Sequence, residues 1–249
     1  MTLSVAWLTQ LLLITIRLGT VLLFTPIQAI RQLPITIRLL LLFSISVLMT
    51  SNLKEYASFD ESKLILGGIA EFANGVILAS GLFAAFAVFQ IAGQLIDNET
   101  GLNSLALFNP AEHSQDPLSS RLISMLAVLF FFNLDAHLLL LKGLSYSFII
   151  IPPGTIALFP GFTPVIKQFG FMFTVGFMIA SPVILALLAI DLFGGLITRN
   201  IPQINTYFLI LPLKICLGLF LLSLMLGSLY PIVNEVFELC FQTWQELMS

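Results

Sequence analysis

Charged residues are scarce in this 249-residue sequence, because only 9% of its positions carry Asp, Glu, Lys or Arg and the formal net charge is −3. A soluble domain of this length needs more polar surface than that to stay dispersed. So small a net charge, without a basic cluster, also argues against a nucleic-acid-binding protein. The chain is 58% hydrophobic and holds 23 Phe, which excludes a disordered protein. The composition therefore predicts a helical membrane protein.

The sequence also has few residues of the kinds that catalyse reactions or bind metal ions. Its two cysteines, Cys216 and Cys240, have no paired spacing, and neither His113 nor His137 has a second metal ligand one helical turn away. It contains no Gly-x-Ser-x-Gly, His-Glu-x-x-His, phosphate-binding glycine loop or Cys-x-x-Cys motif. We therefore expect no catalytic residue, no metal site, no cofactor and no enzymatic activity.

Six apolar runs are long enough to cross a bilayer, which takes about 20 residues in a helix. They cover residues 3–24, 35–53, 64–96, 122–141, 169–193 and 204–229. Two segments interrupt this pattern: residues 97–117 are the longest polar stretch, and residues 149–164 stay apolar although they include four prolines and two glycines. Broken apolar backbone at membrane depth needs neighbouring groups to bond its N–H and C=O groups, so we expect residues 149–164 to pack against protein.

Ionisable side chains occur inside these apolar runs, where a charge at a helix centre costs about 3 kcal/mol unless protein or water surrounds it. They are Arg17, Arg38, Glu71, Asp135, His137, Asp191 and Lys214. Glu71 lies in a stripe with Gly67, Gly75 and Ala79, four residues apart, which is typical of close helix packing. We favour pairing of these charges within or between subunits. A proton relay through Glu71, a transport role for the cations and an acid pair of an intramembrane protease are the alternatives.

Several short stretches follow one another in an order and at a spacing typical of one family. They are RLGTVLLFTPIQ (17–28), LPITIR (33–38), IAGQLID (91–97), TG (100–101), LFNP (107–110), DAHLLL (135–140), FIIIPPG (148–154), RNIPQIN (199–205) and LPLK (211–214). Together they resemble the FliR family of flagellar export-gate proteins, which is related to the SctT family of virulence type III secretion. The chain departs from the family pattern at Glu99, Asn109, Asp135 and Ala136.

The resemblance implies an all-α membrane protein of about six hydrophobic helices with broken segments. A FliP-like part, residues 1–168, would be joined to a FliQ-like helical hairpin and tail, residues 169–249. The implied function is that of a non-enzymatic subunit of the flagellar type III export gate, in the bacterial inner membrane within the flagellar basal body. Its implied partners are FliP-like and FliQ-like subunits, an FlhB-like export protein and unfolded flagellar substrates in transit. The alternatives are the equivalent subunit of a virulence secretion system and, less favoured, a secondary transporter.

The resemblance also implies roles for particular residues. A pore plug would consist of Gly101, Leu105, Leu107, Phe108, Asn109 and Pro110, because a hydrophobic constriction excludes water and ions. The alternative is a surface loop with an incidental phenylalanine. Polar contacts between helices or subunits would come from Arg17, Arg38, Glu71, Gln94, Asp191, Arg199, Gln203, Asn205 and Lys214.

Overall fold

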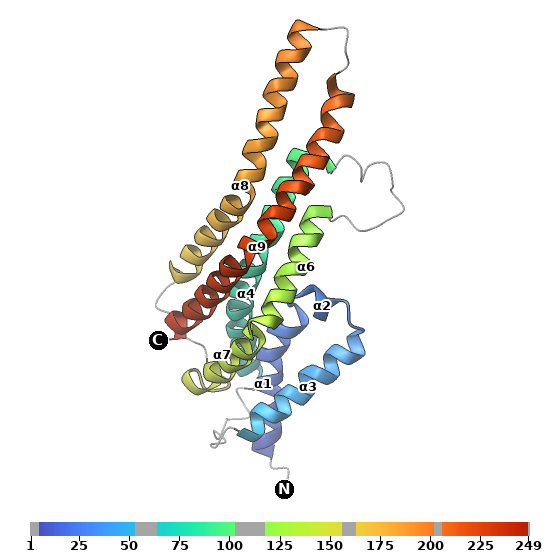
Figure 1. Ribbon diagram of the computed structural model, residues 1–249. Helices are drawn as coiled ribbons and strands as arrows, with labels where there is room; N and C mark the ends of the chain where they lie inside the picture. The colour runs from blue at the N-terminus through green and yellow to red at the C-terminus, as the bar shows by residue number, and fades with distance from the viewer. Residues whose placement is uncertain (1–4, 53–63, 103–117, 156–162, 202–205, 249) are drawn as a thin grey trace. The chain divides into compact units, whose positions relative to one another are not determined.

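The computed structural model describes residues 5–52, 64–102, 118–155, 163–201 and 206–248, and within these ranges it contains helices and no strand (Figure 1). The helices are α1 (Val5–Leu23), α2 (Gln28–Arg31), α3 (Ile35–Asn52), α4 (Leu64–Thr100), α6 (Leu118–Asn133), α7 (Ala136–Ile150), α8 (Thr163–Asn200) and α9 (Thr206–Met248). In this described part, five helices are long and apolar enough to cross a membrane, or six spans if α6 and α7 count as one. The prediction of an all-α membrane protein is confirmed.

The apolar run at residues 122–141 is not one continuous helix. α6 ends at Asn133 and α7 begins at Ala136, and the two helices are bent by 70° at the break. Asp135 lies between them with a φ of 55°, in the left-handed region that Asp and Asn tolerate better than most residues. The break follows from local backbone chemistry, which a count of apolar residues does not register.

Three other helices are longer than their apolar runs. α4 continues to Thr100, so the polar stretch predicted from residue 97 begins with a helical turn. α8 covers residues 163–200, beyond both ends of the predicted 169–193. α9 passes through Pro231 and ends at Met248, whereas the apolar run ends at residue 229. Its last turns are amphipathic, with buried residues three or four apart, at Val233, Val236, Phe237, Cys240, Trp244 and Leu247.

The chain divides into two compact units, the first of which comprises Met1–Ala85, Phe131–Phe169 and Phe237–Ser249. In this unit α1 packs against α3, and the aromatic rings of Phe131 and Phe237 meet edge to face with centroids 5.1 Å apart. Trp244 is 1% exposed and lies against Gly81 and Gly143. A Cβ atom added at Gly81 would lie 2.7 Å from the indole nitrogen, so the absence of a side chain there makes room for the tryptophan.

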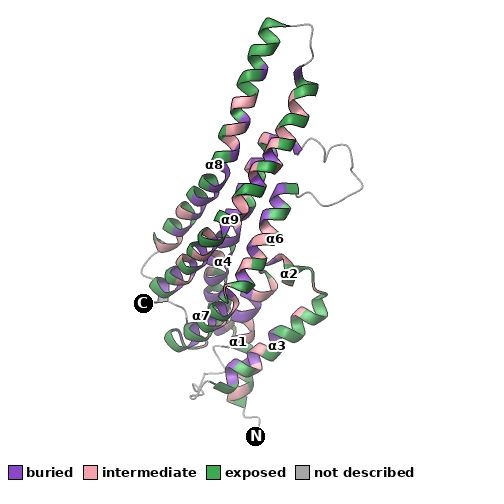
Figure 2. Ribbon diagram, viewed as in Figure 1, coloured by how far each residue is buried: buried purple, intermediate pink, exposed green. Residues whose placement is uncertain are grey.

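The second unit comprises Phe86–Phe130 and Gly170–Val236 and includes most of the α8–α9 pair. The two helices are antiparallel, because Asp191 bonds to Lys214 and Thr198 bonds to Thr206. Most residues near the connection between α8 and α9 are exposed (Figure 2). They include large apolar side chains, among them Leu192 and Phe208, each more than 70% exposed. A surface of this kind needs lipid or other protein to cover it.

Candidate functional site

A buried ion pair between α1 and α4 is the centre of the polar structure in the first unit. Arg17 and Glu71 both have 0% exposed side chains. The Arg17 Nε atom donates to Glu71 Oε2 at 2.5 Å and its Nη2 atom donates to Oε1 at 2.9 Å, so the contact is bidentate. Such a fork-to-fork geometry fixes the relative position of the two helices as well as neutralising the charges.

The remaining Arg17 donors are used on the end of α7. Nη1 donates to the carbonyl oxygen of Ser147 at 3.0 Å and to its hydroxyl at 3.3 Å, and Nη2 donates to the carbonyl oxygen of Ile151 at 3.1 Å. All five guanidinium N–H groups are therefore bonded. The guanidinium carbon also lies 4.5 Å from the ring centroid of Phe148. Because the last carbonyl groups of a helix carry partial negative charge, α7 ends on a cation supplied by α1.

α4 holds the turn that follows α7. The backbone N–H of Gly154 donates to Glu71 Oε1 at 2.8 Å, and Asn74 Nδ2, almost one helical turn along α4, donates to the carbonyl oxygen of Thr155 at 2.9 Å. Gly154 has a φ of 87°, a conformation that favours glycine. Within the segment 149–164 the structure describes residues 149–155 and 163–164. The backbone groups of Ile151, Gly154 and Thr155 bond to side chains of α1 and α4, as expected of interrupted apolar backbone that packs against protein.

Close approach of α1 and α4 accompanies the ion pair. A Cβ atom added at Gly75 would lie 2.8 Å from the carbonyl oxygen of Arg17 and would collide with the Thr20 hydroxyl. Gly67, Glu71, Gly75 and Ala79 are all buried, as the small-residue stripe predicts. Glu71 accepts three hydrogen bonds and is closed to solvent, so this arrangement favours the pairing interpretation over a proton relay.

A second buried carboxylate, Asp97 on α4, lies in the second unit and bonds to the start of α6. Its Oδ1 accepts the N–H of Ser119 at 3.0 Å and its Oδ2 accepts the N–H of Ser120 at 2.8 Å. An anion at this place satisfies free N–H groups at a helix N-terminus and interacts favourably with the helix dipole. Asp97 therefore connects the two ends of the segment 103–117. Sequence reasoning did not select it, because Asp97 lies in the last turn of α4 and caps a helix that begins more than 20 residues later.

Two glycines close to Asp97 allow the backbone to turn at the end of α4 and to approach α6. Gly101 follows α4 with a φ of 79°, which ends the helix in the left-handed conformation that glycine adopts readily. Gly93 faces Ser120, since a Cβ atom added there would lie 2.7 Å from the Ser120 nitrogen and would collide with its Cα. The backbones of α4 and α6 are thus in direct contact beside the Asp97 cap.

A partly exposed charge cluster joins α8, α9 and the end of α4 in the second unit. Lys214 Nζ lies 2.7 Å from Asp191 Oδ2 and 3.9 Å from Glu99 Oε2. The lysine side chain is 13% exposed, against 43% for Asp191 and 33% for Glu99. With two carboxylates and one ammonium group, the cluster carries one net negative charge at an otherwise apolar surface.

Known proteins resemble this chain along nearly its whole length. The family described as "Bacterial export proteins, family 1" matches residues 8–240. The chain belongs to this family. It is 30% identical over 246 residues to the flagellar biosynthetic protein FliR of Bacillus subtilis (strain 168), which covers 96% of this chain and 94% of that protein. It is 30% identical over 253 residues to the FliR protein of Aquifex aeolicus (strain VF5), covering 97% and 95%.

One relative of this FliR-family chain has a different name from the flagellar proteins. The Yop proteins translocation protein T of Yersinia pestis is 26% identical over 172 residues, or 67% of this chain and 65% of that protein. Together with the FliR proteins, this relative confirms the predicted resemblance to the FliR family and its virulence counterparts. Family membership does not by itself assign roles to single residues.

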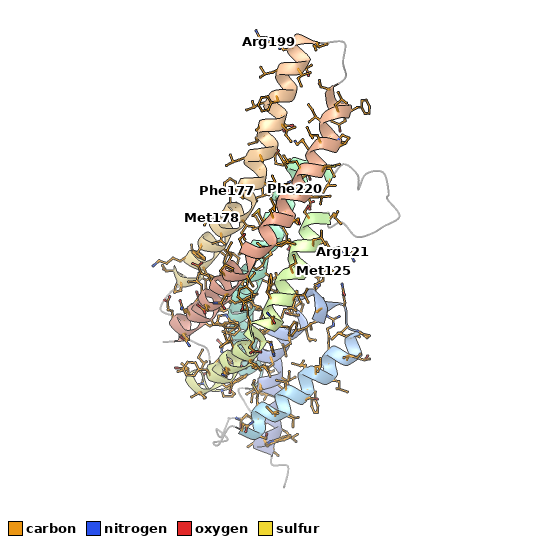
Figure 3. All side chains as sticks on the ribbon, viewed as in Figure 1. Arg121, Met125, Phe177, Met178, Arg199 and Phe220 are labelled. Carbon is orange, nitrogen blue, oxygen red and sulfur yellow. The ribbon has the colours of Figure 1, made fainter. Side chains whose placement is uncertain are left out.

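The structure brings together only some of the residues that the FliR-family resemblance selects. Arg17 pairs with Glu71, and Asp191 pairs with Lys214. Arg38 is half-buried, with Nη1 at 3.5 Å from the Leu23 carbonyl oxygen. Two selected residues are exposed, namely Gln94 and Arg199, the latter at the end of α8 in Figure 3. Leu105, Leu107, Phe108, Asn109, Pro110, Gln203 and Asn205 lie outside the described residues, and Gly101 lies at their edge.

Side chains that could ligate a metal ion are scattered over the described ranges. Within these ranges no three His, Cys, Asp or Glu residues are grouped so that they could hold a metal ion. Asp135 lies at the start of α7, and His137 packs beside Phe132 with ring centroids 5.4 Å apart. Asp135 and His137 therefore both lie at the N-terminal end of α7.

Proposed function

We propose that this protein is a non-enzymatic structural subunit of the flagellar type III protein export gate. It would lie in the bacterial inner membrane within the flagellar basal body and form part of the pore for unfolded flagellar proteins. The observation that carries this proposal is the 30% identity to the flagellar biosynthetic protein FliR of Bacillus subtilis across 96% of the chain. The five apolar helices of spanning length in the described ranges support a membrane location.

In this proposal the chain combines a FliP-like part, residues 1–168, with a FliQ-like hairpin and tail, residues 169–249. FliP-like and FliQ-like subunits would cover the apolar residues of α8 and α9, and an FlhB-like export protein would join the assembly. The exposed apolar side chains of α8 and α9 support such a cover, because a subunit surrounded by protein gains free energy by burying them. The exposed residues Gln94 and Arg199, with Gln203 and Asn205, would make contacts with those subunits.

The proposed pore plug is the segment that starts at Gly101 and includes Leu105, Leu107, Phe108, Asn109 and Pro110. The Asp97 cap supports this assignment, because it fastens the helices on both sides of the segment to each other. A loop with fixed ends keeps its apolar residues at one place, and a hydrophobic constriction at that place excludes water and ions. Unfolded substrates would displace the loop during export.

The test is to remove residues 105–116 in a strain whose own copy of the gene is deleted, while keeping the FliP-like and FliQ-like subunits. The gate should assemble in normal amount, and membrane vesicles containing it should leak ions. A variant with a Gly/Ser segment of equal length is the control, because it keeps the loop but removes its apolar residues, and it should leak as well. Normal assembly without leakage would show that these residues do not plug a pore.

A second experiment separates the export gate from a secondary transporter. The gate proposal expects stable co-purification with FliP-like and FliQ-like subunits, whereas a transporter would move a solute as the purified chain alone. The match to the Yop proteins translocation protein T favours one further candidate, the equivalent subunit of a virulence secretion system. Rescue of motility in a fliR deletion strain, compared with rescue of effector secretion in a strain lacking the virulence counterpart, distinguishes the two systems.

A further inference from the structure

The C-terminal end of α9 is held in the first unit by a buried tryptophan. Phe237, Cys240 and Trp244 follow one another on one face of this helix end, and each is at most 2% exposed. The Trp244 ring occupies the space that two glycines leave open, Gly81 of α4 and Gly143 of α7. Apolar packing accounts for the position of the ring. It does not account for the polar N–H group that the indole carries.

Two buried polar atoms in this part of the first unit have no hydrogen-bond partner among the described residues. One is the indole Nε1 atom of Trp244, which is a donor, and the other is the side-chain oxygen of Gln168 in the first turns of α8, which is an acceptor. Both side chains are almost completely buried. Burying a polar group without a partner is costly, so such groups are nearly always bonded to protein or to ordered water.

The orientation of the Gln168 amide follows from its other contacts. Its Nε2 atom donates to the carbonyl oxygen of Gly81 at 3.2 Å, and a side-chain hydrogen bond joins Gln168 to Cys240. Rotating the amide by half a turn would place its oxygen against the Gly81 carbonyl oxygen, so that two acceptors would face each other. The unpaired atom of Gln168 is therefore an acceptor, which is the kind of group that the indole N–H requires.

Both unpaired atoms lie beside the same glycine. A Cβ atom added at Gly81 would lie 2.7 Å from Trp244 Nε1 and 3.3 Å from Gln168 Oε1. The two atoms are therefore at most about 6 Å apart, the sum of these distances, and they do not bond to each other directly. A water molecule with hydrogen bonds of about 2.9 Å to each atom bridges a separation of this size. Buried waters need about two to four polar partners, and this place offers two.

We propose that a single water molecule binds between Trp244 and Gln168. It accepts the indole N–H and donates to the amide oxygen, so that both buried groups are satisfied. This water bonds the end of α9 to the start of α8, and the Gln168 amide connects both to the Gly81 carbonyl group of α4. The glycine itself is part of the site, because a side chain at position 81 would take the place of the water.

The test is solution NMR of the purified full-length chain in detergent micelles, with isotope-labelled tryptophan. The sequence has two tryptophans, so Trp7→Phe assigns the two indole resonances. The Trp244 N–H should show a nuclear Overhauser cross-peak to long-lived water. Gln168→Met, which keeps the length of the side chain and removes the acceptor, should abolish this cross-peak. Gln245→Met is the matched control, because Gln245 is the exposed neighbour of Trp244, and the cross-peak should remain.

Three results would overturn the proposal. A parent chain without the cross-peak would show that the indole N–H is unbonded or bonds directly to the amide, and this result requires no variant to fold. A cross-peak that persists in Gln168→Met would mean that the Gln168 amide does not hold the water. Cys240→Ala should keep the cross-peak, and its loss in that variant would mean that the thiol proton, rather than a water molecule, gives the signal.

Discussion

Replacing Glu71 by Gln is the sharpest test of the buried centre at Arg17. The substitution keeps the shape of the side chain and one oxygen acceptor. It removes the negative charge that, among the described residues, contacts the fully buried Arg17 guanidinium group. Removing one partner of such a pair leaves an uncompensated buried charge, which costs about 3–5 kcal/mol. The substitution should also remove a hydrogen bond. The carboxylate has two oxygens for the two Arg17 donors and the Gly154 N–H, whereas the Gln amide has one.

The assay is thermal unfolding of the purified chain in detergent. For a chain of this size 1 kcal/mol corresponds to about 2–4 °C, so Glu71→Gln should lower the Tm by roughly 6–20 °C. Glu235→Gln is the matched control, because it makes the same chemical change at an exposed carboxylate of α9 and should leave the Tm unchanged. The double variant Arg17→Met with Glu71→Leu removes both charges and should recover part of the loss.

Two results would refute this reasoning. A Tm of Glu71→Gln within experimental error of the parent would mean that the ion pair does not hold α1, α4 and the end of α7 together. A double variant less stable than Glu71→Gln would mean that the bonds to Ser147, Ile151 and Gly154 matter more than the charge balance. Either outcome would move the explanation from electrostatics to backbone hydrogen bonding.

The remaining predictions concern backbone positions and a helix cap. Gly154→Ala should destabilise the chain by about 1–2 kcal/mol, because its φ of 87° is unfavourable for alanine, as measured by Tm. Asp97→Asn should cost about 1–2 kcal/mol and speed hydrogen exchange at the first amides of α6, whereas Glu99→Gln should not. Gly93→Ala should cost about 1–3 kcal/mol through overpacking, whereas Gly195→Ala meets open space inside a helix and should stabilise by up to about 1 kcal/mol.

Each of these predictions has a clear contrary result. An unchanged Tm in Gly154→Ala would mean that the turn relaxes to another conformation without cost. Equal hydrogen exchange in the Asp97 and Glu99 variants would remove the cap as the anchor of the segment 103–117. A Gly93 variant as stable as the Gly195 variant would show that α4 and α6 separate easily beside Ser120.

The sequence by itself determined the class of the protein and the faces on which its helices pack. Long apolar runs predict membrane helices, because insertion into a bilayer depends on about 20 residues that are consecutive in the sequence. The packing face of one helix is predicted by Gly67, Glu71, Gly75 and Ala79, which repeat with the helical period. The order of short motifs predicted the FliR family. The sequence predicted the ends of the helices least well. Mean hydropathy does not register the amphipathic turns of α9 beyond residue 229 or the left-handed backbone of Asp135.

Only the tertiary structure decided which polar groups meet. Arg17 bonds to Glu71, 54 positions away, and to Ser147, 130 positions away, while Asp97 bonds to backbone amides more than 20 residues further on. Pairing at such separations depends on how the helices pack. From the sequence alone, each buried charge could pair with several groups of opposite charge. The predicted partners of these charges therefore remained open until the helices were placed, because no local pattern encodes the distance between two side chains on different helices.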